Sequence, residues 1–329
     1  MTALTPTLQA FFTERLIRQR QASAHTIAAY RDTMRLLLAH VAGRSGIPPS
    51  RLDLADLDAP VIARFLDHLE TERGNSVRTR NARLAAIHSL FRFAALQHPE
   101  HAASISRVLA VPPKRSDHAL VTYLTEVEVD ALLSACDQST WTGRRDNALL
   151  LLAAQTGLRI SELIGLSCRD IHLAVGPHVA CHGKGRKDRI TPLTTPTIDV
   201  LRTWIRERSG EPHSPLFPTR RGQTLSRDAI EHRIAHYARI AANDCPSLQD
   251  KKVTAHVLRH TTAMRLLQAG VDTSVIALWL GHENVETTQI YLTADLTIKE
   301  RALARTTPPT SPPGRYQPAD ELLTWLDGL

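Results

Sequence analysis

Cysteine is scarce in this chain, and its spacing excludes several classes of protein. The 329 residues include four cysteines, at Cys136, Cys168, Cys181 and Cys245. No two of them stand in Cys-x-x-Cys spacing, so the sequence indicates neither a zinc site nor a thiol redox motif. Scattered thiols in a chain of this length are typical of a reducing compartment, and we expect buried or incidental thiols.

Long apolar runs are also missing. No stretch is long enough to span a bilayer, and three arginines, Arg15, Arg18 and Arg20, interrupt the first apolar run, which excludes a secretory signal peptide. No internal repeat is visible, and low complexity is confined to a proline-rich stretch at 306–318. We therefore expect a cytoplasmic protein with no membrane partner.

Lysine is rare, although the chain is basic. Only 6 of the 40 basic residues are lysine, and the net charge is +7. Residues 1–117 carry 16 basic and 10 acidic residues, a net of +6, whereas residues 118–329 carry 24 and 23, a net of +1. The basic first part predicts a polyanion-binding module, although a solvated basic surface explains the same excess equally well.

Length and composition allow two soluble domains, each with its own core. In the first 110 residues, apolar spacing predicts four amphipathic helices: 5–20, one that follows Ser23 or His25, 60–72, and one from Ser76 to about Leu96. The proline-containing segment that follows is typical of a linker. We therefore expect a small helical domain at 1–110 and a linker at 111–118.

The start of the fourth helix carries a polar and basic cluster. Its members are Arg78, Thr79, Arg80, Asn81 and Arg83. Such a cluster could enter a DNA major groove or bind phosphates. A solvated basic face explains the same residues equally well.

After the linker, helical and strand patterns are mixed. A capping box at Thr125 and Glu128 predicts a helix to Cys136, and further helices are expected at 144–156, 195–208 and 226–242. Between them, IHLAV, HVACHG and DRITPL predict a three-stranded antiparallel sheet with Lys184 in its second turn. The expected fold class is therefore mainly α with a small antiparallel β-sheet: a helical first domain and a mixed α/β domain at 119–305.

The last residues have a pattern of their own. We expect a proline-rich stalk and a short amphipathic helix within 306–329, with Leu322, Leu323, Trp325 and Leu326 on the apolar side. A terminal apolar helix on a stalk cannot bury itself locally. It must dock on its own body or on a neighbour.

A group of residues suited to phosphate chemistry lies near the C-terminal end. His256 and Arg259 are three apart on a helix that begins after Thr254, so they share a face. His282 follows a glycine that is expected to end the next helix, and Tyr291 follows on a third helical segment. Two imidazoles, a guanidinium and a phenol, with no carboxylate at the matching positions, suit a phosphate better than a carbonyl.

Two earlier residues complete a set of six. Arg159 lies at the end of a buried helix, and Lys184 lies in the hairpin turn. Two arginines can clamp a phosphodiester and neutralise a pentacoordinate transition state without a metal. A tyrosine can attack phosphorus, and a lysine can protonate the leaving oxygen.

Each of these residues has a plainer explanation as well. Arg159 could be a structural arginine paired with Glu162 or Asp170, and Lys184 could be solvated. Glu162 is better explained as a partner of Arg159 or a helix cap than as a catalytic acid. His256 and His260 have the spacing of a zinc helix, but no glutamate follows His256, so a metalloprotease is disfavoured and His260 is expected to be a structural hydrogen-bonding residue.

Four segments resemble the tyrosine recombinase (phage integrase) family, especially its Xer-like members. They are TGLRISELIGL, HGKGRKDRITPL, HVLRHTTAMRLLQAG and WLGHENVETTQIYL, in the order and spacing of the family. More weakly, HTIAAYRD and RTRNARLAAIHSLFRFA are similar to the SAM-like core-binding domain of that family.

The resemblance implies a role for each matching residue. Arg159 and Arg259 would clamp the phosphate, and Lys184 would be the general acid. His256 would assist as acid and base, and His282 would bond the scissile phosphate. Tyr291 would be the nucleophile that forms a 3′-phosphotyrosine bond.

The implied protein is a site-specific recombinase or integrase, such as a mobile element carries. Its substrate would be double-stranded DNA, and it would need no metal, ATP or other cofactor. It would act as a homotetramer, or with a paired recombinase, on synapsed DNA, and a C-terminal helix would pass to the neighbouring protomer. The alternatives are a type IB topoisomerase and a non-catalytic DNA-binding regulator.

Overall fold

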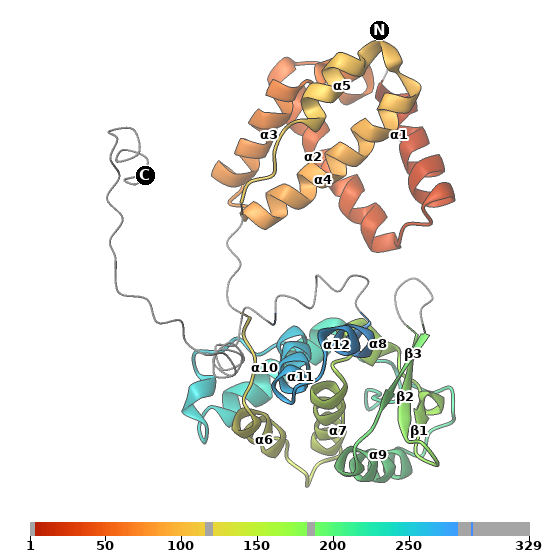
Figure 1. Cartoon of the computed structure of the whole chain (residues 1–329), viewed down its shortest axis with the longest axis vertical. Coiled ribbons are helices and arrows are strands. Elements are labelled where there is room, and N and C mark those ends of the chain that lie inside the picture. The colour runs from red at the N-terminus through yellow and green to blue at the C-terminus, as the bar shows by residue number, and fades with distance from the viewer. Residues whose placement is uncertain (1–3, 116–120, 183–187, 282–290, 292–329) are drawn as a thin grey trace, which may run out of the picture. The chain divides into compact units, whose positions relative to one another are not determined.

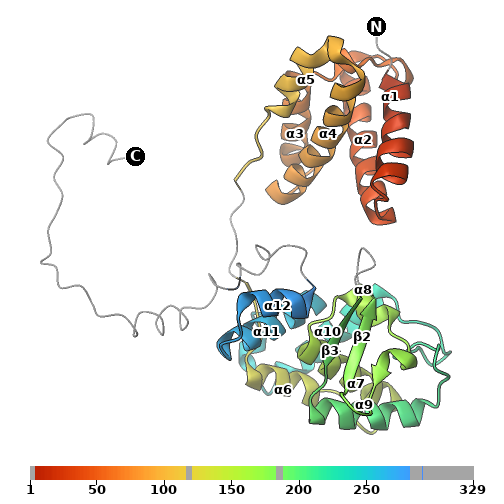
Figure 2. The same cartoon turned by 45° about the vertical axis from the view of Figure 1, so that its right-hand side comes forward.

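The computed structural model of the chain describes residues 4–115, 121–182, 188–281 and 291. The chain divides into two compact units, Met1–His118 and Ala119–Leu329 (Figures 1 and 2). Helices dominate both units, and one three-stranded antiparallel sheet lies in the second, so the predicted fold class is confirmed. Within the described ranges, no helix is both long and apolar enough to cross a membrane.

The first unit is built from helices alone in its described part. They are α1 (Leu4–Ala10), the π-helical η1 (Phe11–Gln19), α2 (Ala24–Ser45), the 3-10 turns η2 (Pro49–Arg51) and η3 (Leu54–Asp56), α3 (Ala59–Thr71), α4 (Val77–Gln97), the 3-10 turn η4 (Pro99–His101) and α5 (Ala102–Leu109). The four predicted helices are therefore present. The helix α5 was not predicted, because it is only eight residues long and its apolar pattern is correspondingly short.

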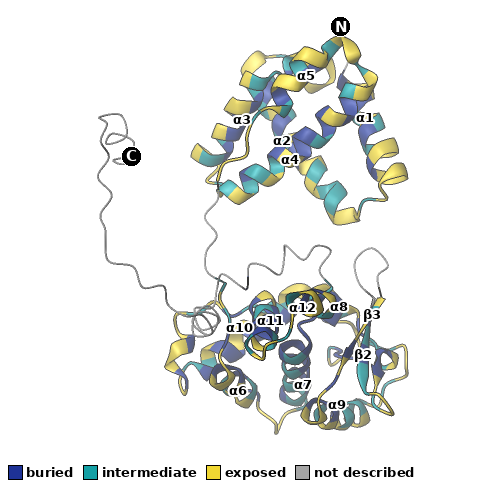
Figure 3. Ribbon diagram, in the orientation of Figure 1, coloured by how far each residue is buried: buried dark blue, intermediate teal, exposed yellow. Residues whose placement is uncertain are grey.

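Serine side chains define where two of these helices begin. The Ser23 hydroxyl accepts a hydrogen bond from the Thr26 backbone N–H at the start of α2, and Ser76 accepts one from Thr79 at the start of α4. The apolar stripes of the helices then meet in one core that includes the buried Phe11, Leu37, Phe65 and Phe91. Figure 3 shows the buried residues of these helices facing inward and the exposed residues facing outward.

The second unit combines helices with the small sheet. Its elements are α6 (Glu126–Ser134), α7 (Trp141–Thr156), α8 (Ile160–Gly165), the 3-10 turn η5 (Cys168–Asp170), β1 (Ile171–His172), β2 (His178–His182), β3 (Asp188–Pro192), α9 (Thr195–Arg208), α10 (Arg227–Ala241), the 3-10 turn η6 (Pro246–Leu248), α11 (Ala255–Gln268) and α12 (Thr273–Leu280). The strands pair in the order β1-β2-β3, both pairs antiparallel, as the sequence predicted. The described cysteines are all free thiols, and three of the four are buried.

The buried helix α7 organises this unit, with α9 and α11 packed against it. Near its start, the fully buried Arg145 donates two hydrogen bonds to Asp146 Oδ1, at 2.9 and 2.7 Å. The other oxygen of Asp146 accepts from Arg233 and Tyr237 of α10, at 2.7 and 2.9 Å. Because the buried carboxylate of Asp146 is paired with both arginines and with the phenol of Tyr237, this network can hold α10 against α7. It thereby fixes the helix whose other end carries the candidate site.

Candidate active site

The guanidinium of Arg259 lies in the interior of the second unit. The hydroxyl of Thr254 caps α11 by accepting from the Val257 backbone N–H at 3.2 Å, as predicted. Arg259, in the second turn of that helix, is 4% exposed. It donates to the carbonyl of Gly157 and to the carbonyl of Leu280, each at 2.7 Å. One side chain therefore joins the ends of α7 and α12.

A glycine is required at the end of α7. Gly157 has a φ of +65°, in the left-handed region. A Cβ atom there would also lie 2.7 Å from Leu280 Cδ2 and 3.1 Å from Thr262 Cβ. The glycine therefore lets α7, α11 and α12 approach closely enough for Arg259 to bridge them.

Arg159 lies two residues after this turn, at the cap of α8. Its backbone N–H donates to Glu162 Oε2 at 2.7 Å, and its Nη1 pairs with Glu162 Oε1 at 2.9 Å. Its Nη2 donates to the Gly281 carbonyl at 2.7 Å. Both non-catalytic roles predicted for Glu162 are therefore confirmed. It is the ion-pair partner of Arg159, and it also caps the helix.

The carboxylate of Glu162 joins Arg159 to the sheet. Arg189 of β3 donates from Nη1 to Oε1 at 2.9 Å and from Nη2 to Oε2 at 2.8 Å, a bidentate pair. Burial alone would raise the pKa of Glu162, but the hydrogen bonds from Arg189 and Arg159 outweigh it and lower that pKa. An ionised carboxylate therefore lies between two arginines, and its pairing with Arg159 is the one that the sequence predicted.

The electrostatics of Arg259 and Tyr291 are linked. Burial and the nearby charge of Arg159 lower the pKa of Arg259 to about 10, so it remains a cation at neutral pH. Tyr291 is 2% exposed, and this burial raises the pKa of its phenol, while the charge of Arg259 acts in the opposite direction. The phenol therefore keeps its proton in the resting protein, beside a cation that favours its ionised form.

The phenol of Tyr291 has a histidine partner on α11. Its hydroxyl lies 3.0 Å from Nδ1 of His260, and the two rings meet edge to face with centroids 5.4 Å apart. His260 also meets the ring of His256, one helical turn earlier, at 4.1 Å between centroids. Two of the six predicted residues, His256 and Tyr291, are therefore connected through His260.

Four of the six predicted catalytic residues, Arg159, His256, Arg259 and Tyr291, are thus gathered around the ends of α7, α11 and α12. Lys184, His282 and the predicted helical segment around Tyr291 lie outside the described residues. So do the stalk and the terminal helix predicted within 306–329. The strands that flank Lys184 are described, and Arg189 ties β3 to Glu162.

Sequence reasoning missed Arg189 and did not anticipate the contact made by His260. Arg189 lies inside the matched segment HGKGRKDRITPL, but a strand pattern alone does not identify its ion-pair partner. His260 was expected to be structural, and the signal that could have drawn attention to it is its spacing of four from His256.

The predicted DNA-contacting cluster on α4 separates into two kinds of residue. Arg78 is exposed, and Thr79 and Arg83 are half-buried. Arg80 is 5% exposed and donates to the Pro112 carbonyl at 3.3 Å, near Glu70 at 3.7 Å. Asn81 bonds the backbone of Lys114 in both directions, at 2.7 and 3.0 Å. Arg80 and Asn81 therefore hold the start of the predicted linker against α4.

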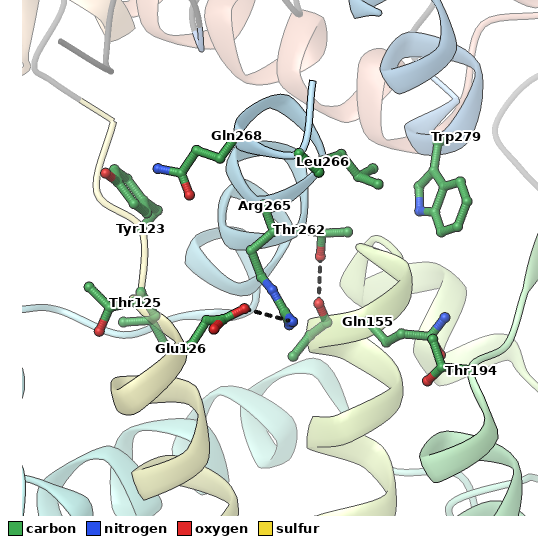
Figure 4. Close-up of a pocket in the computed structure, with 13 residues that line it drawn as sticks. Tyr123, Thr125, Glu126, Gln155, Thr194, Thr262, Arg265, Leu266, Gln268 and Trp279 are labelled. Carbon is green, nitrogen blue, oxygen red and sulfur yellow. Dashed lines mark hydrogen bonds and ion pairs between the residues drawn. The ribbon is translucent and has the colours of Figure 1, made fainter. Parts of the chain in front are cut away.

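A separate cavity of about 580 Å³ lies beside α11. It is lined by residues that include Tyr123, Glu126, Arg265 and Trp279, and Figure 4 shows Arg265 reaching toward Glu126, 3.5 Å away. At 100° per residue, Arg265 projects about 180° from His256, so the cavity belongs to a different face of α11. Within the described ranges, no group of three or more histidine, cysteine or acidic side chains is placed to hold a metal ion.

Comparison with protein families gives two matches. Residues 122–297 match the model of the phage integrase family, and residues 10–98 match that of the phage integrase N-terminal SAM-like domain. A relative from Sinorhizobium fredii, named as an integrase/recombinase, is 54% identical across 99% of this chain and 98% of its own length. The tyrosine recombinase XerD of Vibrio cholerae is 36% identical, over 83% of this chain and 87% of its own.

Solved structures agree with the fold. The XerH site-specific recombinase, bound to a palindromic difH substrate in a post-cleavage complex, matches with a TM-score of 0.70 and 25% identity. The match covers 87% of this chain and 81% of that one. A transposon integrase in complex with transposon right-end DNA matches with a TM-score of 0.69 at 18% identity, a likeness of fold.

Proposed function

The chain belongs to the phage integrase family of tyrosine recombinases, and from that premise we propose that it cuts and rejoins DNA strands through a covalent 3′-phosphotyrosine at Tyr291. Membership makes it an enzyme of site-specific DNA recombination. The finer proposal concerns how it acts. Strand cleavage and rejoining proceed without metal or ATP, because the energy of the broken phosphodiester is kept in the protein–DNA bond.

The clamp of Arg159 and Arg259 supports this chemistry. Each guanidinium has five N–H donors, and backbone carbonyls and Glu162 hold both groups in place. Donors that remain can bind the two non-bridging oxygens of a phosphate and neutralise charge as phosphorus becomes pentacoordinate. Glu162 and the carbonyls preorganise the clamp, so little rearrangement is required when DNA binds.

The remaining roles divide between the two sides of the scissile bond. Tyr291 attacks phosphorus, aided by the charge of Arg259. Lys184 protonates the 5′ oxygen as it leaves, because an alkoxide is too basic to leave alone. His282 bonds the phosphate, and His256 assists proton transfer beside it. The product is a 3′-phosphotyrosine and a free 5′-hydroxyl.

The proposed partner is double-stranded DNA, bound by the first unit through the exposed face of α4 as well as by the second. We propose that a homotetramer, or a pair of recombinases, synapses two duplexes. Residues 1–110 would be the core-binding domain, 111–118 its linker, and 119–305 the catalytic domain. The segment at 306–329 would dock on a neighbouring protomer.

The charge interactions that link Arg259 to both Arg159 and Tyr291 carry the proposal, since a regulator that only binds DNA needs no phenol there. Cognate duplexes can be selected on the protein from a random-sequence library and then nicked close to the cleaved position. Cleavage then releases a short 5′-hydroxyl fragment that diffuses away, and the protein remains attached. We expect a protein–DNA adduct that survives denaturant, and its loss in Tyr291→Phe with DNA affinity unchanged.

The controls separate the rival functions. An adduct that persists in Tyr291→Phe would disprove the assignment of the nucleophile. Binding without any adduct on every selected duplex would favour the non-catalytic regulator. Adducts without strand exchange between two sites would favour a type IB topoisomerase.

A further inference from the structure

We propose that His260 accepts the phenol proton of Tyr291 as the oxygen attacks phosphorus, and so acts as the general base for the nucleophile. The inference rests on the proposed function of Tyr291. It assigns a task to a histidine that the six-residue set does not contain. It also assigns the two proton transfers of the reaction to different parts of the site.

The geometry places an acceptor directly on the reacting oxygen. His260 Nδ1 lies 3.0 Å from Tyr291 Oη, within hydrogen-bond distance. In a neutral imidazole with the hydrogen on Nε2, Nδ1 is an acceptor, so the phenol O–H donates to it. The edge-to-face contacts of His260 with Tyr291 and His256 hold the ring between them.

The neighbouring groups favour this assignment. Arg259 stabilises the ionised phenol through its charge, but a guanidinium has only donors and cannot receive the proton. Both oxygens of Glu162 accept hydrogen bonds from Arg159 and Arg189, so its carboxylate is committed to them. A buried phenol that keeps its proton at neutral pH requires a base at the moment of attack.

Every proton is accounted for in both cleavage and rejoining. During cleavage the Tyr291 O–H bond breaks and an N–H bond forms at His260 Nδ1, while the O–P bond to tyrosine forms. The bond from phosphorus to the 5′ oxygen breaks, and that oxygen takes a proton from the general acid. A phenol is a much weaker acid than an imidazolium, so the proton moves only as the oxygen bonds to phosphorus. Rejoining reverses each step, and His260 returns the proton to the departing phenol.

A substrate with sulfur in place of the 5′ bridging oxygen separates the two proton transfers. A thiolate leaves without protonation, so a variant that lacks the general acid recovers on this substrate, and a variant that lacks the base does not. Adduct formation is measured on oxygen and sulfur duplexes of the selected site. The proteins are wild type, His260→Ala, His260→Asn and Lys184→Ala, with the exposed His232→Ala as a matched histidine control.

We expect His260→Ala to slow adduct formation about 10²-fold on both substrates, with His232→Ala unchanged. His260→Asn keeps an acceptor oxygen but no base, so it should retain folding and DNA affinity and still be at least about tenfold slow. Adduct formation by Lys184→Ala should recover only on the duplex with the 5′ bridging sulfur.

Two results would overturn the inference. One is a wild-type rate in His260→Asn on both substrates, which would make His260 a positioning residue alone, and this variant decides the matter if His260→Ala fails to fold. The other is recovery of a slow His260 variant on the sulfur substrate, which would place the residue on the leaving-group side. Neither result bears on the nucleophile itself, which Tyr291→Phe tests separately.

Discussion

The carboxylate of Glu162 is a single group on which two guanidiniums depend. It caps α8, pairs with Arg159 and receives the bidentate pair from Arg189. Substitution by glutamine keeps the shape but removes the charge and turns one oxygen into a donor. Glu162 therefore offers a test that distinguishes charge from shape.

We expect Glu162→Gln to lower the free energy of unfolding by about 2–3 kcal/mol at neutral pH and to reduce adduct formation. Because the folded pKa of Glu162 is lowered, its contribution to stability is complete above the ordinary carboxyl pKa, near 4.5, and is lost as pH falls through the folded value. Denaturant unfolding of wild type and variant at pH 7 and near pH 3 measures the loss of stability and its dependence on pH. The difference between wild type and variant should shrink at the acidic pH, and a constant difference would contradict the ion-pair explanation.

The contacts of individual residues were predictable where both partners lie close together in the sequence. Thr125 and Glu128 form the predicted capping box, with hydrogen bonds of 2.8 and 3.3 Å. In contrast, the contact between His260 and Tyr291 joins residues 31 apart in sequence. No periodic pattern encodes such a contact, because it depends on how separate elements pack.

At the scale of elements, α4 has one face for the core of its unit and another for solvent. Arg78 and Arg80 are two residues apart, so they project about 200° apart around the helix. Arg80 is buried against the Pro112 carbonyl, and Arg78 is exposed. The same residue type therefore has two different tasks within one helical turn.

We expect Arg80→Ala to lower the stability of the protein by about 2 kcal/mol, because it removes buried hydrogen bonds and leaves a gap. Arg78→Ala should leave stability unchanged. It should weaken DNA binding several-fold and reduce the slope of log affinity against log salt by about 1, as expected for a lost phosphate contact. Thermal melting and binding titrations at several salt concentrations compare the pair. Equal effects of both variants on the melting temperature would contradict the assignment of a structural role to Arg80 and a DNA-binding role to Arg78.

Elements were predicted best where the pattern was long or its period changed. The three strands were recognised from short β-branched runs between glycine turns, and their order and direction are as expected. The helix predicted at 5–20 is present, but its second part is π-helical, and hydrophobic periodicity does not distinguish π from α geometry over nine residues. The short α5 gave too few turns to be recognised.

At the scale of the whole molecule, synapsis distinguishes a recombinase from a topoisomerase. The sequence of the last residues predicts an apolar helix that must be covered by another surface. Deleting residues 308–329 should therefore leave adduct formation on a single site intact. It should lower recombination between two sites about tenfold or more, equivalent to about 1.4 kcal/mol of lost association.

A point variant makes this test specific to apolar contact. Trp325→Asp should reproduce the deletion, and Asp320→Ala should behave as wild type, as measured by strand exchange between two labelled duplexes. Unchanged recombination in the deletion would reject docking on a neighbour.

Under the proposed function, the turn at the end of α12 would position the phosphate clamp. Gly281 has a φ of +65°, and a Cβ atom there would lie 2.8 Å from Arg189 Nη1. The carbonyls of Leu280 and Gly281 hold Arg259 and Arg159, and His282 is the next residue. The two guanidiniums therefore share one backbone reference, and a shift of about 1 Å in that turn would misplace both of them together. The accuracy of the proposed cleavage would thus depend on main-chain geometry at the end of α12.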